Sequence, residues 1–141
     1  MVVIVDDEPD IAASLQDLVG NDLHYEVVSA SSPEEGLAIL KSLETTPPAL
    51  LIVDYRMPRI DGVQFLQRAR KMFPGLPAIM VTAYAHLDLV MRAARDLKVA
   101  RFLRKPLHAE QVLAAVQEVV SHHWRGLLRQ AAFDRSVEAH A

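Results

Sequence analysis

The chain has no cysteine, little aromatic character and no long apolar run. The absence of cysteine among its 141 residues excludes disulfide bonds, thiolate zinc sites and thiol catalysis. No apolar run approaches the roughly 20 residues of a membrane span, and no basic start leads into an apolar signal segment. A net charge of −3 gives no indication of a nucleic-acid-binding surface. We therefore expect a cytoplasmic protein that binds neither membranes nor, directly, nucleic acid.

What the sequence does contain is a regular alternation of short apolar runs with longer helical patterns. With 51% apolar and 23% charged residues, it is typical of one globular domain. The expected strands are Val2–Val5, Tyr25–Ser29, Leu50–Val53, Ala78–Val81 and Val99–Leu103. The expected helices are about Pro9–Val19, Pro33–Leu43, Gly62–Met72 and Leu87–Leu97, and a last one from near His108 past Val120.

Five strands alternating with five helices predict an α/β fold with a parallel sheet covered by helices on both faces. Sheets of this kind bind ligands outside the carboxyl ends of their strands. The residues at those ends are Asp6, Asp7, Asp54, Thr82 and Lys105. A functional site is therefore expected among these residues.

Their side chains indicate phosphoryl chemistry supported by a metal ion. Three carboxylates at one sheet edge would repel one another unless a cation lay among them. All-oxygen ligation without histidine or cysteine favours a hard ion such as Mg²⁺. Asp54 can serve as a nucleophile that forms an acyl phosphate. Lys105 and the Thr82 hydroxyl can then hold phosphoryl oxygens.

The motifs together resemble those of the response-regulator receiver family. They are Asp6-Asp7-Glu8, Asp54 followed by Met57-Pro58 and Asp61-Gly62, Thr82-Ala83, and Lys105-Pro106, over roughly residues 1–120. Each motif alone is unspecific, but the set in this order is specific. The resemblance implies a flavodoxin-like, doubly wound (βα)5 three-layer sandwich with strand order 2-1-3-4-5, here with an extended C-terminal helix.

The resemblance also implies a role for each site residue. Asp54 is similar to the phosphoacceptor of the family, which a histidine kinase or phosphotransfer protein phosphorylates in a two-component system. Asp7 resembles a direct magnesium ligand, Asp6 one that acts mainly through metal-bound water, and the backbone carbonyl of Arg56 a further ligand. The function implied is that of a signalling protein, and not of an enzyme beyond its own phosphorylation and dephosphorylation.

Two further residues resemble the switch of the family. Thr82 would move onto the phosphoryl group, and Phe102 would turn inward with it. The Lys105-Pro106 bond is usually cis in the family, which would direct Lys105 into the site. Phe102 is equally well explained as a core aromatic.

Arg56 and Tyr84 are large residues two positions after Asp54 and Thr82. We interpret them as crowding the in-line path of a hydrolytic water and prolonging the life of the acyl phosphate. A purely surface role explains them equally well. Asp61, before Gly62 and an apolar helix, is interpreted as a helix cap without a chemical role.

Two other functions share parts of this pattern. Phosphatases of the haloacid-dehalogenase type use aspartate, threonine, lysine and Mg²⁺ on a similar sheet, but their nucleophile lies on the first strand in an Asp-x-Asp-x-Thr run. Here Asp6 is followed by Asp7-Glu8-Pro9-Asp10. A pseudo-receiver that acts only as an interaction module is the other alternative, and the intact acidic site argues against it.

The last residues extend beyond the usual end of a receiver. We expect a receiver domain at 1–120 and a helical extension or linker at 121–141. Val120, Trp124, Leu127 and Ala131 continue an apolar stripe at helical spacing. The stripe favours a linker that pairs with a second copy and leads to an output domain outside this chain. Packing back onto its own receiver is the alternative, and the segment is too short for a helix-turn-helix domain.

Overall fold

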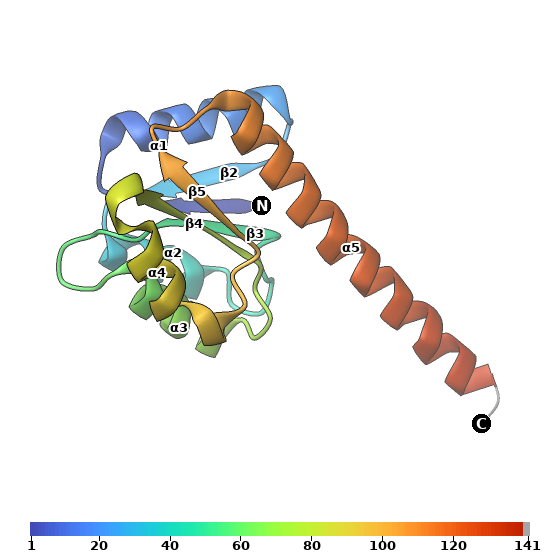
Figure 1. Ribbon diagram of the computed structural model, residues 1–141. Coiled ribbons are helices and arrows are strands. Elements are labelled where there is room, and N and C mark those ends of the chain that lie inside the picture. Colours follow the sequence, from blue (N-terminus) through green and yellow to red (C-terminus); the bar gives the residue numbers. More distant parts are fainter. Residues whose placement is uncertain (140–141) are drawn as a thin grey trace.

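The computed structural model describes the backbone of residues 1–139, and their side chains except those of Tyr84 and residues 136–139. A five-stranded parallel sheet with strand order β2-β1-β3-β4-β5 forms its centre (Figure 1). The strands are β1 (Val2–Val5), β2 (Val27–Ala30), β3 (Leu50–Asp54), β4 (Ala78–Ala83) and β5 (Arg101–Lys105). The predicted fold class and strand order are confirmed.

Helices cover both faces of this sheet. They are α1 (Pro9–Gln16), η1 (Asp17–Asp22), α2 (Pro33–Ser42), α3 (Gly62–Met72), η2 (Tyr84–His86), α4 (Leu87–Ala93), η3 (Arg95–Leu97) and α5 (Ala109–Ala139). Helices α1 and α5 lie on one face, and α2, α3 and α4 lie on the other (Figure 1). With right-handed crossovers, the helix after β1 lies on one face and those after β2, β3 and β4 lie on the other, because the chain crosses the sheet in opposite directions.

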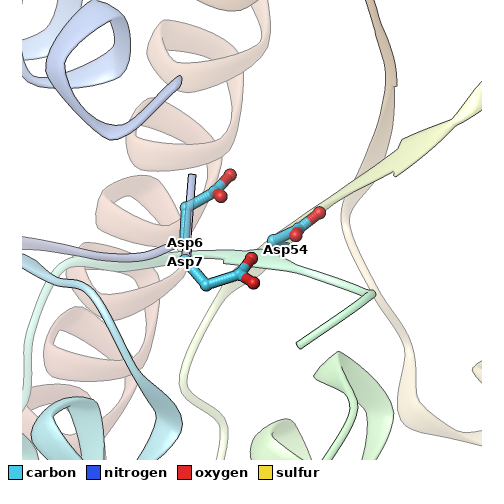
Figure 2. Close-up of side chains that lie close together, drawn as sticks. All are labelled: Asp6, Asp7 and Asp54. Atoms are coloured by element: carbon cyan, nitrogen blue, oxygen red, sulfur yellow. The ribbon is translucent and has the colours of Figure 1, made fainter. Parts of the chain in front are cut away.

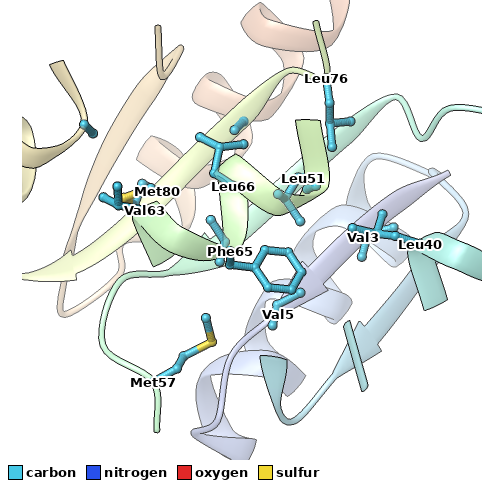
Figure 3. Packing of buried hydrophobic residues seen from close by; sticks show 14 of the residues in the cluster. Val3, Val5, Leu40, Leu51, Met57, Val63, Phe65, Leu66, Leu76 and Met80 are labelled. Carbon is cyan, nitrogen blue, oxygen red and sulfur yellow. The ribbon is translucent and has the colours of Figure 1, made fainter. Parts of the chain in front are cut away.

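The core consists of two apolar layers, one on each face of the sheet. Strands β1 and β3 are buried along their whole length, which explains their uninterrupted apolar sequences. Phe65 of α3 is the largest fully buried side chain and packs with Val5 and Leu40 on the α2–α3 face (Figure 3). On the other face, Leu15 and Val116 pack against β1, β3 and β4. A rigid sheet therefore supports the strand ends.

Two helices differ from the sequence-based expectation. The α-helical part of the first helix ends at Gln16, and the chain continues as a π-helix to Asp22, with Leu23 N–H donating to Leu18 O. This wider turn keeps Val19 buried. The fourth helix ends at Ala93 and continues as the short helix η3.

The last strand also begins later than expected, at Arg101 instead of Val99. Lys98 adopts a left-handed backbone conformation with φ of 50°, which ends η3 and turns the chain. Ala100 N–H then donates to Ala78 O before the ladder to β4 begins. As a result, Lys105 is the last residue of β5 and opposes Ala83 of β4.

Helix α5 has 31 residues and extends well beyond the sheet (Figure 1). Its buried residues end at Val119. We call residues 121–135 the stem; it exposes Trp124, Leu127, Leu128 and Phe133, each with half or more of its surface open. Among the described helices, none combines the length and apolar character needed to cross a membrane.

Candidate functional site

Three carboxylates meet at the carboxyl end of the sheet. Asp6 and Asp7 directly follow β1, and Asp54 is the last residue of β3. Because Val5 pairs with Val53 in the β1–β3 ladder, Asp6 lies next to Asp54. One carboxylate oxygen from each of the three lies within 4.8 Å of the others (Figure 2). The structure thus brings together the three acids that the sequence analysis singled out.

Burial makes this cluster costly in its ionised form. Asp6 is 1% exposed and Asp54 is 3% exposed. Desolvation, together with the charge of Asp6, raises the pKa of Asp54 to about 7, although the charge of Lys105 opposes the shift. Burial likewise raises the pKa of Asp6. Binding of a cation would therefore strongly stabilise the ionised form of these carboxyl groups.

The hydrogen bonding of Asp6 agrees with a metal site. Its Oδ1 accepts a hydrogen bond of 2.8 Å from Glu8 N–H. Its Oδ2 is buried and has no hydrogen-bond partner among the described residues. A buried oxygen that accepts no hydrogen bond, with only Lys105 Nζ 3.6 Å away, is costly unless a metal ion or ordered water completes its coordination. The oxygen-only donor set fits Mg²⁺, which keeps several of its waters.

Lys105 joins the cluster from the end of β5. Its Nζ lies 3.3 Å from Asp54 Oδ1, 3.6 Å from Asp6 Oδ2 and 2.7 Å from Glu8 Oε1. Burial alone would lower the pKa of Lys105, but the hydrogen bond to Glu8 and the charges of Asp54 and Asp6 outweigh it and raise that pKa. The peptide bond that follows, Lys105-Pro106, is cis, as the resemblance implied.

Sequence reasoning missed the part played by Glu8. Its position before a helix with proline in the first turn is typical of a cap residue, yet its side chain makes no cap hydrogen bond. Glu8 is 97 residues from Lys105, so only the fold brings them together. The sole signal in the sequence was a third acid directly after the acidic pair.

Thr82 lies on β4, the neighbour of β3, and Phe102 lies on β5, the next strand along the sheet. Thr82 is 2% exposed, and its hydroxyl makes only a long hydrogen bond of 3.4 Å to Ala83 O. It follows Val81, which pairs with Asp54 in the ladder. Phe102 is partly buried and packs against the core cluster on the α4 side of the sheet. Both positions suit a switch, and Phe102 suits core packing as well.

Arg56 lies in the loop after β3 and is exposed. Its guanidinium Nη1 lies 3.1 Å from His86 Nε2, so it bridges the β3–α3 loop to helix η2. His86 was not singled out from the sequence, because the contact spans 30 residues. The side chain of Tyr84, the second residue assigned to dephosphorylation control, lies outside the described residues.

Gly62 and Asp61 shape the loop that carries Arg56. A Cβ atom at Gly62 would lie 2.7 Å from Asp54 O and 2.9 Å from Tyr55 Cα, both backbone atoms that cannot easily shift. Asp61 caps α3 in a reciprocal capping box with Gln64. The structure supports the interpretation of Asp61 as a cap, and glycine at position 62 lets the loop fold back onto the acceptor strand.

Comparison with known proteins agrees with this geometry. A family model described as the response regulator receiver domain matches residues 2–117. The DNA-binding transcriptional regulator NtrC of Klebsiella pneumoniae is 33% identical over 121 residues, covering 85% of this chain and 24% of that protein. The chain thus spans about a quarter of the length of this relative and of its Escherichia coli counterpart.

Solved structures show the same likeness. A response regulator receiver domain protein from Clostridium thermocellum superposes with a TM-score of 0.78 at 28% identity, covering 90% of this chain and 97% of that one. A receiver domain protein described as CheY-like, from Methanospirillum hungatei, gives 0.77 at 28% identity, covering 89% and 96%. The acidic cluster, Lys105, the fold and the sequence all agree with this likeness. The chain belongs to the response regulator receiver domain family.

Proposed function

We propose that this receiver accepts a phosphoryl group on Asp54 in a Mg²⁺-dependent reaction, from a histidine kinase or phosphotransfer protein of a two-component system. The observation that supports this most is the convergence of three carboxylates and Lys105 at the carboxyl end of the sheet, where Asp6 and Asp54 are buried. Asp54 lies at its centre, 3.3 Å from the lysine. A buried carboxylate held beside a cation, with room for a metal ion, is the arrangement that nucleophilic attack on phosphorus requires.

Asp6, Asp7 and Asp54 would hold the magnesium ion, with the backbone carbonyl of Arg56 as a further ligand. When bound, the ion would neutralise the carboxylates and the oxygens of the incoming phosphoryl group. Asp6 Oδ2, which accepts no hydrogen bond and has the Lys105 ammonium group 3.6 Å away, supports this assignment. Asp7 is more exposed than Asp6 and Asp54, so a hydrated metal ion would reach its carboxylate directly from solvent.

The residues of the chain would then perform the transfer. One Asp54 oxygen attacks phosphorus as the donor group leaves, and the product is an acyl phosphate. Lys105 pairs with one phosphoryl oxygen, and the Thr82 hydroxyl donates to another. Lys105 already lies close enough to the acceptor to do so. Thr82 has no strong hydrogen bond to give up, since its bond to Ala83 O is 3.4 Å long.

Movement of Thr82 would switch the surface formed by α4, β5 and α5. Phe102 packs in the same apolar layer as Val90 of α4 and as Ala94, which directly follows that helix, so a change in its position reaches α4. Helix α4 exposes Leu89 and Met91, 58% and 47% open, on the surface that would change. Phosphorylation would thus bias a two-state element that partners recognise.

Arg56 and Tyr84 would slow hydrolysis of the acyl phosphate by crowding the path of the attacking water. The contact between Arg56 and His86 supports this, because it holds a large side chain across the loop next to the acceptor. We expect Arg56→Ala and Tyr84→Ala to shorten the life of the phosphorylated state roughly threefold to tenfold. Decay of the phosphorylated mass after removal of the donor measures this. Unchanged decay in both variants would leave them as surface residues only.

The remaining partners follow from the stem and from the relatives. We propose a receiver domain at 1–120, an extension at 121–141 that pairs with a second copy, and an output domain outside this chain. The exposed Trp124, Leu127 and Leu128 support pairing, because a projecting helix seldom leaves such side chains in water. Next to the stem, a hollow of about 420 Å³ lined by Phe73, Leu76 and Leu127 could receive a partner side chain. A cytoplasmic location is proposed with this role.

Intact-mass measurement tests the acceptor function. The protein is incubated with acetyl phosphate, with and without Mg²⁺, alongside Asp54→Asn. We expect a phosphoryl-sized gain that requires Mg²⁺ and is absent in the variant. No gain with the wild type, under small-molecule donors or a kinase, would instead favour an interaction module that works without phosphorylation.

A further inference from the structure

The ion pair between Glu8 and Lys105 has a chemical consequence for the proposed phosphorylation. Lys105 Nζ has three hydrogen atoms to donate and three carboxylate oxygens around it, from Glu8, Asp54 and Asp6. The shortest of the three distances, 2.7 Å, is the one to Glu8. The ammonium group is therefore directed chiefly at a residue outside the acidic cluster.

A phosphoryl oxygen on Asp54 would need one of these three positions. Asp6 and Asp54 cannot withdraw, because both are buried and fixed at strand ends. The side chain of Glu8 is 58% exposed and can turn into water at little cost. Its negative charge would also repel the phosphoryl oxygens if it stayed. Glu8 is thus the partner that an incoming phosphoryl group displaces.

We propose that Glu8 is a positioning residue that holds Lys105 in the unphosphorylated state and competes with the phosphoryl donor for its ammonium group. This inference rests on the proposed function and adds a residue that sets how readily the site accepts a donor. Glu8 acts through Lys105 and does not touch phosphorus. Glu8 therefore affects the affinity for the donor more than the rate of phosphoryl transfer in the donor-bound complex.

Glu8→Gln tests the proposal, because it removes the charge and keeps the shape of the side chain. Asp10→Asn is the matched control, since Asp10 is an exposed acid in the first turn of the same helix that makes no ion pair with Lys105. Each protein is phosphorylated with acetyl phosphate over a range of donor concentrations at saturating Mg²⁺, and over a range of Mg²⁺ concentrations at one donor concentration. The half-saturating donor concentration and the limiting rate are read from intact mass.

We expect Glu8→Gln to lower the half-saturating donor concentration about two- to fivefold, as befits a partly exposed ion pair, with the limiting rate changed less. Asp10→Asn should match the wild type. The difference between Glu8→Gln and the wild type should shrink at high salt, because screening weakens the pair that is lost. Thermal unfolding of both variants should stay close to that of the wild type, which shows that they fold.

Three results would overturn the proposal. Equal half-saturation in Glu8→Gln and the wild type would show that Glu8 does not compete. An equal shift in Asp10→Asn would reduce the effect to general charge. A higher Mg²⁺ requirement in Glu8→Gln, without a change in half-saturation for the donor, would make Glu8 a metal-site residue. If the wild type itself gains no phosphoryl mass, the proposed function fails, and this result is distinct from the three that concern Glu8.

Discussion

The surroundings of the Asp54 carboxyl group oppose its ionisation, although the Lys105 ammonium group lies 3.3 Å from it. Burial and the neighbouring charge of Asp6 raise its pKa to about 7, from 3.8 for a free aspartate side chain. Nucleophilic attack needs the ionised form, but the same burial that excludes water leaves a substantial fraction of Asp54 protonated near neutral pH. A metal ion at the site would resolve this conflict, because it binds the carboxylate only after the proton has left.

A pH dependence of stability follows from Asp54. Below about pH 4 both the folded and unfolded states hold the proton, and between about pH 4 and pH 7 only the folded state keeps it. Stability without metal should therefore fall as the pH rises through this window, with an upper bound of about 4 kcal/mol for the full shift. Above about pH 7 the folded state has lost the proton as well, and the cost is complete.

Asp54→Asn removes this cost. In EDTA at pH 8 we expect its melting temperature to exceed that of the wild type by roughly 3–10 °C, and the difference to shrink towards pH 4. Differential scanning calorimetry across that range measures both. Mg²⁺ should raise the melting temperature of the wild type at pH 8 more than that of the variant. A difference that grows as the pH falls would contradict the assigned ionisation.

At the scale of elements, the three strands β1, β3 and β5 each deliver one or two charged residues to a single point. Strand β1 leads into Asp6 and Asp7, β3 ends in Asp54, and β5 ends in Lys105. The parallel register explains why, since all carboxyl ends share one edge of the sheet. The capping box of Asp61 and Gln64 then fixes the start of α3 behind the acceptor loop.

The stem of α5 is the element that the receiver fold does not itself require. An isolated helix of this length is marginally stable in water, and its apolar side chains favour a covered state. Val120, Trp124, Leu127 and Ala131 follow the spacing of a helix pair. Because the two copies are identical, a two-fold pairing would bury the same stripe from both.

We therefore expect the protein to dimerise at micromolar to high micromolar concentration. Trp124→Ser combined with Leu128→Ser should shift it towards the monomer by roughly tenfold or more in dissociation constant. Arg125→Ser, an exposed stem position between them, is the control that should dimerise like the wild type. Light scattering with and without phosphoryl donor provides the masses. A wild type that stays monomeric at high micromolar concentration under both conditions would rule out pairing through the stem.

On the scale of the whole molecule, apolar periodicity and strand-end residues were enough to predict the architecture. The five strands follow from short apolar runs separated by helical patterns, whereas their order came from the resemblance to the receiver family. Helix α3 was predicted with its observed bounds at Gly62 and Met72. The ends of other helices and strands were predicted less accurately, because the local backbone conformation determines where they fall. The π-helix after Gln16 and the left-handed Lys98 have no clear apolar signature in the sequence.

The residues of the candidate site likewise fall into those that the sequence could predict and those that it could not. Asp6, Asp7, Asp54, Thr82 and Lys105 could be found because each lies at or next to a strand end. Glu8 and His86 could not, because their partners Lys105 and Arg56 are distant in sequence and side-chain direction decides the contact. Spacing along a chain locates strand ends well, but it does not tell which charged side chains meet across them.

Chemical trapping shows directly whether Asp54 carries the phosphoryl group. Borohydride reduces an aspartyl phosphate to homoserine, so the protein is treated with acetyl phosphate and Mg²⁺, reduced, digested and sequenced by mass spectrometry. We expect homoserine at position 54, only when Mg²⁺ is present, and none in Asp54→Asn. Homoserine at Asp6 or Asp7 instead, or a phosphoryl gain that leaves position 54 unreduced, would contradict it.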